Sequence, residues 1–254
     1  MIETCLHQGR LGNRILELLG AGVLAQKLNL YLSPEEIYLG NPTRTGQGID
    51  IDNFISTFYL NPKLHQGRVV TEPVVNFTDD MCIKNMDIET YGIGNYKLVN
   101  ASFQIPAFIA KYYKEFRNVL LPLNPVKQNT GVFVHSRVGD VMPPRTATYE
   151  YYINCLEKIK PSHGVFSTED ADRHPMIKEI SKKYNLEIIY KKPAENILYG
   201  SSFEHLVLDA GTYSFIIGLL SNARTKFIYF PPPDQVWCTN LAANLSGWHV
   251  TSYK

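Results

Sequence analysis

Short apolar runs that fit β-strands alternate with longer runs of helical periodicity in the second half of the chain. The expected strands cover residues 131–136, 164–168, 186–190 and 226–230, and the expected helices cover 149–160, 174–184 and 213–223. Strands and helices that alternate in this way predict an α/β fold with a mostly parallel sheet and helices on both faces. Sheets of this kind place ligands at the carboxyl ends of their strands.

The first half of the chain begins with the same kind of unit. We expect a strand at 2–6, a turn at 8–12, a helix at 13–27 and a strand at 28–32. Long loops should follow, with a helix from about 105 to 119 before segment 121–129, which contains two prolines and two asparagines. This segment predicts a boundary between an N-terminal domain, 1–125, and a C-terminal domain, 126–254.

Composition excludes several classes of function. Lys plus Arg number 25 and Asp plus Glu number 24, so the chain has no global basic charge that would attract nucleic acid. The four cysteines form no C-x-x-C pair, which argues against a zinc knuckle and a dithiol redox site. No window of about 18 apolar residues and no signal peptide is visible, so we expect a soluble cytoplasmic protein without a membrane span.

The opening loop, Gly9 to Asn13, is the first candidate site. Glycines between a strand and a helix let the backbone approach a ligand closely, and the N–H groups of a helix start favour an anion such as phosphate. The loop does not match the G-x-G-x-x-G pattern, and no Walker lysine follows it. A plain turn with Asn13 as the helix cap fits the same residues equally well.

The second candidate is VFVHSRVGDV, 132–141, where an expected strand ends and is followed by charged residues. Alternation along the strand places His135 and Arg137 on the same side. The arginine offers a fork of donors that suits a diphosphate at any working pH. An ion pair between Arg137 and Asp140 that fixes the loop is the alternative, with His135 as a packed residue.

The third candidate is LVLDAGTYSFIIGLLSNA, 206–223. Asp209, Gly211, Thr212 and Ser214 lie just before or at the start of an apolar helix, whose free N–H groups could bind an anion. A simple helix cap formed by Thr212 or Ser214 is the alternative.

Together these three stretches resemble a known family of enzymes. GRLGN resembles the start of the protein O-fucosyltransferases, and HSRVGD resembles the H-x-R-x-G-D signature of the α-1,2-, α-1,6- and protein O-fucosyltransferases. DAGTYSFIIGLLSNARTKFIYF is similar to the late G-T-F-x-x-W-x-x-x-L segment of the α-1,2-fucosyltransferases. The three stretches occur in the family's order between residues 5 and 230. Val138 stands where many α-1,2-fucosyltransferases carry a second arginine, and Ile216 or Ile217 stands at the tryptophan.

This resemblance implies a GT-B fold, in which two Rossmann-like domains face a cleft, with the acceptor side in the N-terminal domain and the donor side in the C-terminal domain. It implies an inverting glycosyltransferase that moves a sugar, first of all L-fucose from GDP-fucose, to a hydroxyl of a glycan or glycoprotein. Another GDP-sugar or a UDP-sugar is the alternative donor. No metal or other cofactor is implied, and a bacterial or viral glycan pathway would suit such a chain.

The resemblance also implies roles for individual residues. Arg137 would clamp the β-phosphate, while Gly12 and Asn13 would face the donor's sugar and phosphates. The diphosphate would lie at the helix start that follows Gly211, formed by Thr212, Tyr213, Ser214 and Phe215. His135 and Asp209 would line the nucleotide pocket, and Asp140 would hold the loop.

The general base stays open, because Asp140, His135, Glu17 and a phosphate oxygen of the donor are all chemically competent. Two other functions fit less well. A metal-dependent transferase would use a D-x-D pair such as Asp50 and Asp52, or the acidic segment 169–172. A glycan- or nucleotide-sugar-binding module that has lost its catalytic activity is the non-enzymatic alternative.

Overall fold

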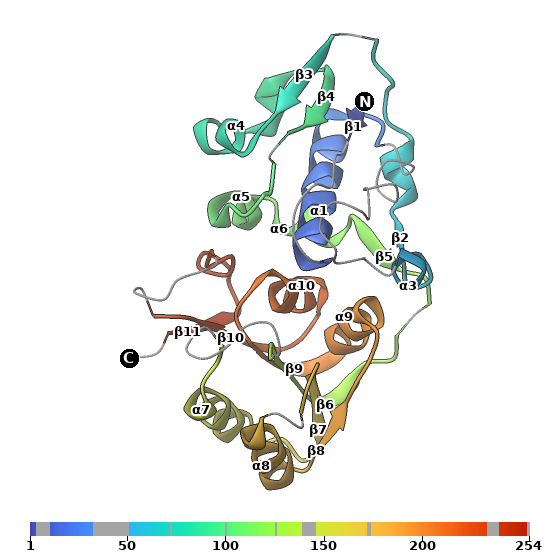
Figure 1. The fold of residues 1–254 in the computed structure, drawn as a ribbon. Coiled ribbons are helices and arrows are strands. Elements are labelled where there is room, and N and C mark those ends of the chain that lie inside the picture. The colour runs from blue at the N-terminus through green and yellow to red at the C-terminus, as the bar shows by residue number, and fades with distance from the viewer. Residues whose placement is uncertain are drawn as a thin grey trace. The chain divides into compact units, whose positions relative to one another are not determined.

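The fold is taken from a computed structural model, and Figure 1 traces it from the N-terminus to the C-terminus. The structure describes residues 1–3, 11–32, 51–71, 73–99, 101–124, 126–138, 146–171, 174–232 and 239–252. The chain divides into two compact units, Met1–Asn124 and Pro125–Lys254. The division lies within the proline- and asparagine-rich segment 121–129.

The C-terminal unit is built on a six-stranded parallel sheet. Its strands are β6 (Asn129–Ser136), β7 (Gly164–Thr168), β8 (Leu186–Ile189), β9 (Phe203–Leu208), β10 (Thr225–Phe230) and β11 (Trp248–Ser252). Their spatial order is β11-β10-β9-β6-β7-β8, and every neighbouring pair is parallel. Numbered from β6, this order is 3-2-1-4-5-6, the order of a doubly wound Rossmann sheet. The expectation of a mostly parallel α/β sheet is therefore confirmed for this unit.

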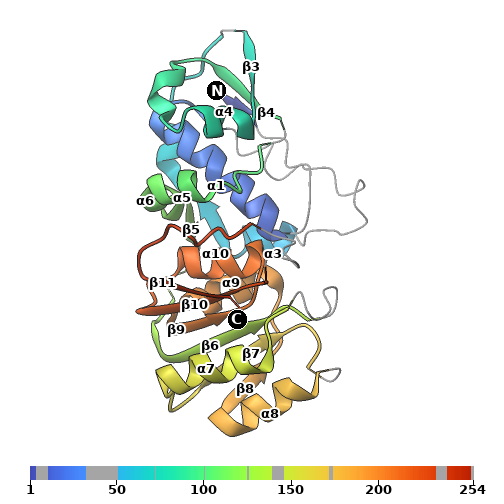
Figure 2. The ribbon, with the colours of Figure 1, turned by 90° about the vertical axis from the view of Figure 1, so that its left-hand side faces the viewer.

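Four helices in the described part of this unit connect its strands and cover both faces of the sheet. They are α7 (Tyr149–Ile159), α8 (Pro175–Tyr184), α9 (Pro193–Ser201) and α10 (Thr212–Leu220). Figure 2 shows α7 and α8 on one face, and α9 and α10 on the other. This division follows from the topology, because right-handed crossovers change face when the direction of strand addition reverses.

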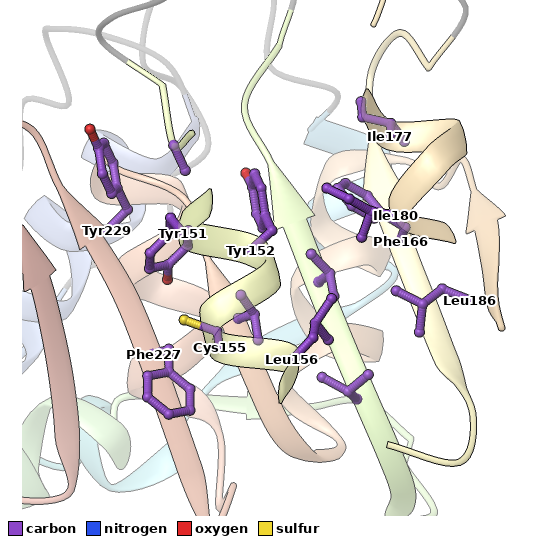
Figure 3. Close-up of a cluster of buried hydrophobic side chains, with 14 of the residues drawn as sticks. Tyr151, Tyr152, Cys155, Leu156, Phe166, Ile177, Ile180, Leu186, Phe227 and Tyr229 are labelled. Carbon is purple, nitrogen blue, oxygen red and sulfur yellow. The ribbon is translucent and has the colours of Figure 1, made fainter. Parts of the chain in front are cut away.

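The alternation of β6 explains how the sheet joins both helix layers. Val132 and Val134 belong to the hydrophobic cluster under α7 and α8. Phe133 points to the opposite face, where a Cβ atom on Gly200 of α9 would come within 2.7 Å of its ring. Figure 3 shows the first layer, in which Tyr152 and Leu156 of α7 pack over the strands beside Phe166 of β7. A strand buried on both faces fits a central position in the sheet.

The N-terminal unit has smaller sheets among its described residues. Its strands are β1 (Ile2–Glu3), β2 (Phe58–Leu60), β3 (Val74–Phe77), β4 (Asn95–Leu98) and β5 (Leu120–Pro122). β1, β4 and β3 form a parallel sheet in that order, and β2 pairs with β5 in the antiparallel direction. The helical segments are α1 (Leu11–Leu28), α3 (Ile51–Ile55), α4 (Asp79–Lys84), α5 (Pro106–Lys111), α6 (Tyr113–Arg117), η1 (Pro62–His65) and η2 (Ile88–Tyr91).

Helix α1 is the central element of this unit and is buried on nearly all sides. Two glycines allow its neighbours to approach closely. A Cβ atom on Gly20 would lie 2.2 Å from the Phe103 ring, and one on Gly22 would lie 2.4 Å from Val119. Phe103 is fully buried although its φ is +54°, so the packing against α1 holds it in a conformation that few L-residues adopt.

Two expectations for this half were wrong in detail. The helix expected at about 105–119 is interrupted at Tyr112, where φ is −109° and ψ is 26°. The Tyr112 hydroxyl donates to the Met86 carbonyl at 2.8 Å and accepts from the Ile88 N–H at 3.1 Å, so contacts with a distant segment fix the break. The strand expected at 28–32 is reduced to single bridges at Leu30 and Leu32, because α1 continues to Leu28.

The start of α1 also differs from expectation. The helix begins at Leu11, so Gly12 belongs to its first turn and not to the preceding turn. The rest of the expected loop, including Gly9, lies outside the described residues. No helix in the described part of the chain is both long and apolar enough to cross a bilayer.

Candidate functional site

The order of strands in the C-terminal sheet reverses between β6 and β9. Ligands of doubly wound sheets bind outside the carboxyl ends of the strands at this position. β6 ends at Ser136 and is followed by Arg137, whereas β9 ends at Leu208 and is followed by Asp209. The two ends are adjacent, because His135 and Leu208 are partners in the parallel ladder. The structure thus brings together residues of the second and third sequence motifs.

Asp209 accepts four hydrogen bonds at this edge. Its Oδ2 atom accepts hydrogen bonds from the Arg137 N–H at 2.8 Å and from the Tyr152 hydroxyl at 3.2 Å. Its Oδ1 atom accepts from the N–H groups of Ala147 and Ala210, both at 2.7 Å. The side chain is completely buried. Asp209 therefore holds the backbone of neighbouring segments, instead of presenting its carboxylate to solvent.

Two opposing effects act on the charge of Asp209. Burial disfavours the carboxylate and is the larger effect, whereas the hydrogen bonds from Arg137, Ala210, Ala147 and Tyr152 favour it. The result is a pKa raised from 3.8 to about 6. The group is ionised at neutral pH and becomes protonated in mildly acidic solution.

His135 faces the start of α10. Its Nδ1 atom lies 2.8 Å from the Ser214 hydroxyl, and its ring lies 5.2 Å from the Tyr213 ring between centroids. Burial and, to a smaller extent, the positive charge of Arg137 together lower the pKa of His135 from 6.5 to about 3. A buried neutral imidazole with this pKa is a poor proton acceptor at neutral pH. The geometry gives His135 a role in orienting Ser214.

Helix α10 presents its amino end at the same edge of the sheet. Gly211 precedes the helix with φ of +106° and ψ of 165°, a conformation available almost only to glycine, and no side chain caps the helix start. The first N–H groups of an α-helix have no intrahelical acceptor, which makes this end suitable for an anion. Thr212 and Ser214 lie in this first turn and are buried.

Phe215 lies at the start of α10, as the family resemblance implied, but its side chain is turned into the protein. Its ring is 1% exposed and stacks on Trp248 with a centroid distance of 5.3 Å, and its N–H donates to the Gly211 carbonyl at 3.1 Å. Both its side chain and its N–H group are thus occupied within the protein. Phe215 anchors the helix to β11, while the residues before it form a helix start that no side chain caps.

The Tyr213 hydroxyl is held by a chain of hydrogen bonds that was not predicted from the sequence. Asn196 of α9 accepts from the Ser167 hydroxyl at 2.8 Å and donates to the Tyr213 hydroxyl at 3.2 Å. Tyr213 in turn donates to the Pro193 carbonyl at 2.7 Å, and burial raises its pKa. A weak signal was present, because Pro193 at the first helical position is typical of a helix start.

Arg137 is half-buried directly after β6. Val138, which stands at the position of the family's second arginine, is 1% exposed and belongs to the hydrophobic cluster under α7 and α8. A charged side chain would be costly at such a position without a partner, so this chain uses the position for packing. Asp140 lies outside the described residues.

The N-terminal unit contains the remaining predicted residues. Gly12 is buried and Asn13 is half-buried in the first turn of α1. One turn further, Glu17 is 9% exposed, and its Oε2 atom is buried without a hydrogen-bond partner. The pKa of Glu17 is raised to about 8. Burial is the largest cause, Arg14 opposes it, and Asp79 adds a smaller upward effect.

No group of three or more metal-ligating side chains is found among the residues that the structure describes. Asp50 and Asp172, which belong to the two acidic patterns weighed from the sequence, lie outside those residues.

Comparison with known proteins adds no family. No model of a known protein family matches the chain, and neither does any curated protein.

Proposed function

We propose that this chain is an inverting glycosyltransferase that uses a nucleotide-sugar donor, with GDP-fucose as the first candidate, and a hydroxyl of a glycan or glycoprotein as acceptor. One observation carries the proposal. Arg137 and the uncapped start of α10, which come from separate motifs, lie where the order of a doubly wound sheet reverses. The two motifs that resemble the fucosyltransferases thus meet at the position where such sheets bind nucleotides.

The chemistry of the arrangement fits the loss of a diphosphate. As the bond between sugar and phosphate breaks, negative charge grows on the leaving diphosphate, and donors that are already in place stabilise it. Arg137 supplies a permanently charged fork of N–H groups, and the α10 start supplies backbone N–H groups at the positive end of the helix dipole. The hydrogen bond between Ser214 and His135 keeps the first turn of this helix in place.

We further propose that the two units have a GT-B organisation. In it, the C-terminal unit binds the nucleotide, and the N-terminal unit supplies the acceptor side together with Gly12 and Asn13. The parallel sheet β1-β4-β3 and the buried helix α1 support an α/β fold for the N-terminal unit.

The proton of the acceptor hydroxyl needs a base. His135 is buried and neutral with its pKa lowered to about 3, which disfavours it for this task. Glu17, with its pKa raised to about 8, has the affinity for protons that a general base needs near neutral pH. Glu17, Asp140 and a phosphate oxygen of the donor remain the candidates.

A ligand panel followed by an activity assay tests the proposal. Thermal unfolding is measured with GDP, GDP-fucose, GDP-mannose, UDP-glucose and, as a control, free L-fucose. We expect GDP-fucose to stabilise the protein, by about 2.7 kcal/mol at about 100 times its Kd. Release of GDP from GDP-fucose, by slow hydrolysis or by transfer, should follow and should persist in EDTA.

Each outcome of this panel is informative. Absence of stabilisation by every nucleotide would overturn the proposal. Stabilisation without release of GDP would indicate a binding module, and stronger stabilisation by a UDP-sugar would change the donor. Loss of activity in EDTA, restored by a divalent ion, would favour the metal-dependent alternative.

A further inference from the structure

Asp209 connects three segments at the carboxyl edge of the C-terminal sheet. Arg137 follows β6, Ala147 lies two residues before α7, and Ala210 follows β9. The N–H groups of all three donate to the Asp209 carboxylate at 2.7–2.8 Å. Asp209 also donates its own N–H to the His135 carbonyl at 3.1 Å. A single side chain thus fixes the backbone that carries Arg137 on one side and the approach to α7 on the other.

We propose that Asp209 is a positioning residue, whose ionised carboxylate fixes the backbone of Arg137 and thereby sets the affinity for the donor diphosphate. The donor half of this inference rests on the proposed function. The tether itself is a property of the ligand-free protein and can be measured without any donor.

The four bonds require a carboxylate in its ionised form. An ionised carboxylate only accepts, with two oxygens that serve two donors each, and this matches the arrangement around Asp209. An amide at this position would retain one oxygen and would direct an NH2 group at two of the four donors. A protonated carboxyl group would likewise place its O–H against a donor. In both cases part of the tether is lost.

Protonation of Asp209 is therefore expected to weaken donor binding in mildly acidic solution. The pKa of Asp209 is raised to about 6, so this loss falls between about pH 7 and pH 5. The titratable and charged groups nearest to Asp209 come from β6 and its exit and from α7: His135, Arg137, Tyr151 and Tyr152. Behind them, Tyr213 of α10 contacts His135, and Cys155 of α7 contacts Tyr151. Arginine stays charged in this range. The pKa of His135 is lowered to about 3, and burial raises the pKa values of the tyrosines and of Cys155.

The first experiment measures the tether in the ligand-free protein. Amide hydrogen exchange at Arg137 and Ala147 is followed by NMR from pH 5 to pH 8 and corrected for the intrinsic pH dependence of exchange. In the unaltered protein, we expect both amides to be protected at pH 8 and to lose protection as Asp209 is protonated. In Asp209→Asn, protection of the Arg137 amide should be low at every pH.

The second experiment measures GDP affinity over the same range by titration calorimetry. We expect Asp209→Asn to weaken GDP binding at pH 7.5 by about tenfold or more, as for a lost hydrogen bond to a charged group, and to abolish the acidic loss. Tyr152→Phe keeps the carboxylate but removes the hydroxyl that lowers its pKa, so the acidic loss should move to higher pH. Glu187→Gln, an exposed carboxyl group on β8, should leave the profile unchanged.

Contrary results separate the inference from the proposed function. An unchanged pH profile in Asp209→Asn and in Tyr152→Phe, with the Arg137 amide still protected, would overturn the inference while GDP binding stands. If the unaltered protein binds no GDP at any pH, the proposed function fails together with the donor half of the inference. The amide measurement then decides on the tether alone.

Discussion

The Nδ1 atom of His135 and the hydroxyl of Ser214 lie 2.8 Å apart, although 79 residues separate them in the chain. The contact joins the end of β6 to the first turn of α10, across the position where the order of the sheet reverses. Both side chains are buried, at 6% and 1% exposure. The second and third sequence motifs therefore lie together at the carboxyl edge of the C-terminal sheet.

His135 should make the stability of the protein pH-dependent. Its pKa is lowered from 6.5 to about 3 in the folded state, so the unfolded chain binds more protons between these values. The contribution of His135 is fully present above pH 6.5 and is lost as the pH falls toward 3. We expect the difference in unfolding free energy between the unaltered protein and His135→Gln to shrink by about 1.4 kcal/mol per pH unit between pH 6 and pH 4.

Urea unfolding of both proteins at pH 4, 5, 6 and 7 measures this difference, because groups that the two proteins share cancel. Parallel curves would show that His135 is protonated as easily in the folded protein as in the unfolded one.

Glu17 should have the opposite effect on the pH dependence of stability, because its contribution to the unfolding free energy is lost as the pH rises. Burial raises its pKa from 4.5 to about 8, so the folded state favours the protonated form. Its contribution to stability is fully present below pH 4.5 and is lost as the pH rises through about 8. Relative to Glu17→Gln, the unaltered protein should lose about 1.4 kcal/mol per pH unit between pH 5 and pH 8.

Urea unfolding at pH 5, 6.5 and 8 measures this loss, with Glu89→Gln, an exposed carboxyl group of the same unit, as the control. A constant difference over this range would contradict the burial of the Glu17 carboxyl group.

Alanine variants of Gly211 and Gly247 distinguish the effect of backbone strain from a direct effect on the donor site. Gly211 and Gly247 both have positive φ values, +106° and +79°, and both lie in the C-terminal unit. Alanine at either position should lower the unfolding free energy by about 1–2 kcal/mol, because left-handed backbone is unfavourable for an L-residue. GDP affinity, measured by calorimetry, should fall only in Gly211→Ala, which reorients the start of α10. Equal GDP affinities in the two variants would exclude the α10 start from the donor site.

The packing of α1 in the core of the N-terminal unit can be tested by adding one methyl group, with the variant Gly20→Ala. A Cβ atom on Gly20 would lie 2.2 Å from the buried Phe103 ring. Gly20→Ala should therefore lower the unfolding free energy by about 1–3 kcal/mol, as expected for an overpacked core. Gln26→Ala, on the exposed side of the same helix, should change it by less than about 0.5 kcal/mol. A stability of Gly20→Ala equal to that of the unaltered protein would contradict the packing of α1.

Elements whose own residues specify them could be predicted from the sequence. The strand of β6 and the helix α7 fall within one or two residues of their predicted bounds, because each has a clear apolar period and α7 has Thr148 as its cap. Helix α9 was not predicted, and its Gly200 is required by the close approach of Phe133, a contact between segments far apart in the chain. The alternation of apolar and polar residues at Trp248 and Val250 is typical of a strand and would have predicted β11.

In the candidate site, too, the features that are local in sequence could be predicted and those that depend on distant contacts could not. Arg137, Ser214 and Gly211 could be proposed because motif patterns and helix-start chemistry are local in sequence. The role of Asp209 could not, because it depends on hydrogen bonds to Arg137 and Ala147, 72 and 62 residues away. The direction of the Phe215 side chain could not be predicted either, because α10 is apolar and buried on both of its faces.

Hydrolysis of GDP-fucose by Arg137→Ala tests the central claim most directly, because it requires no knowledge of the acceptor. The rate of GDP release is compared with that of the unaltered protein and of Arg224→Ala, which removes an arginine that is 81% exposed in the same unit. Circular dichroism confirms that each variant is folded. We expect Arg137→Ala to lose about 10²–10³ in rate, as for removal of one preorganised donor to the developing charge, and Arg224→Ala to lose none. A folded Arg137→Ala that releases GDP at the rate of the unaltered protein would contradict the assignment of the diphosphate site.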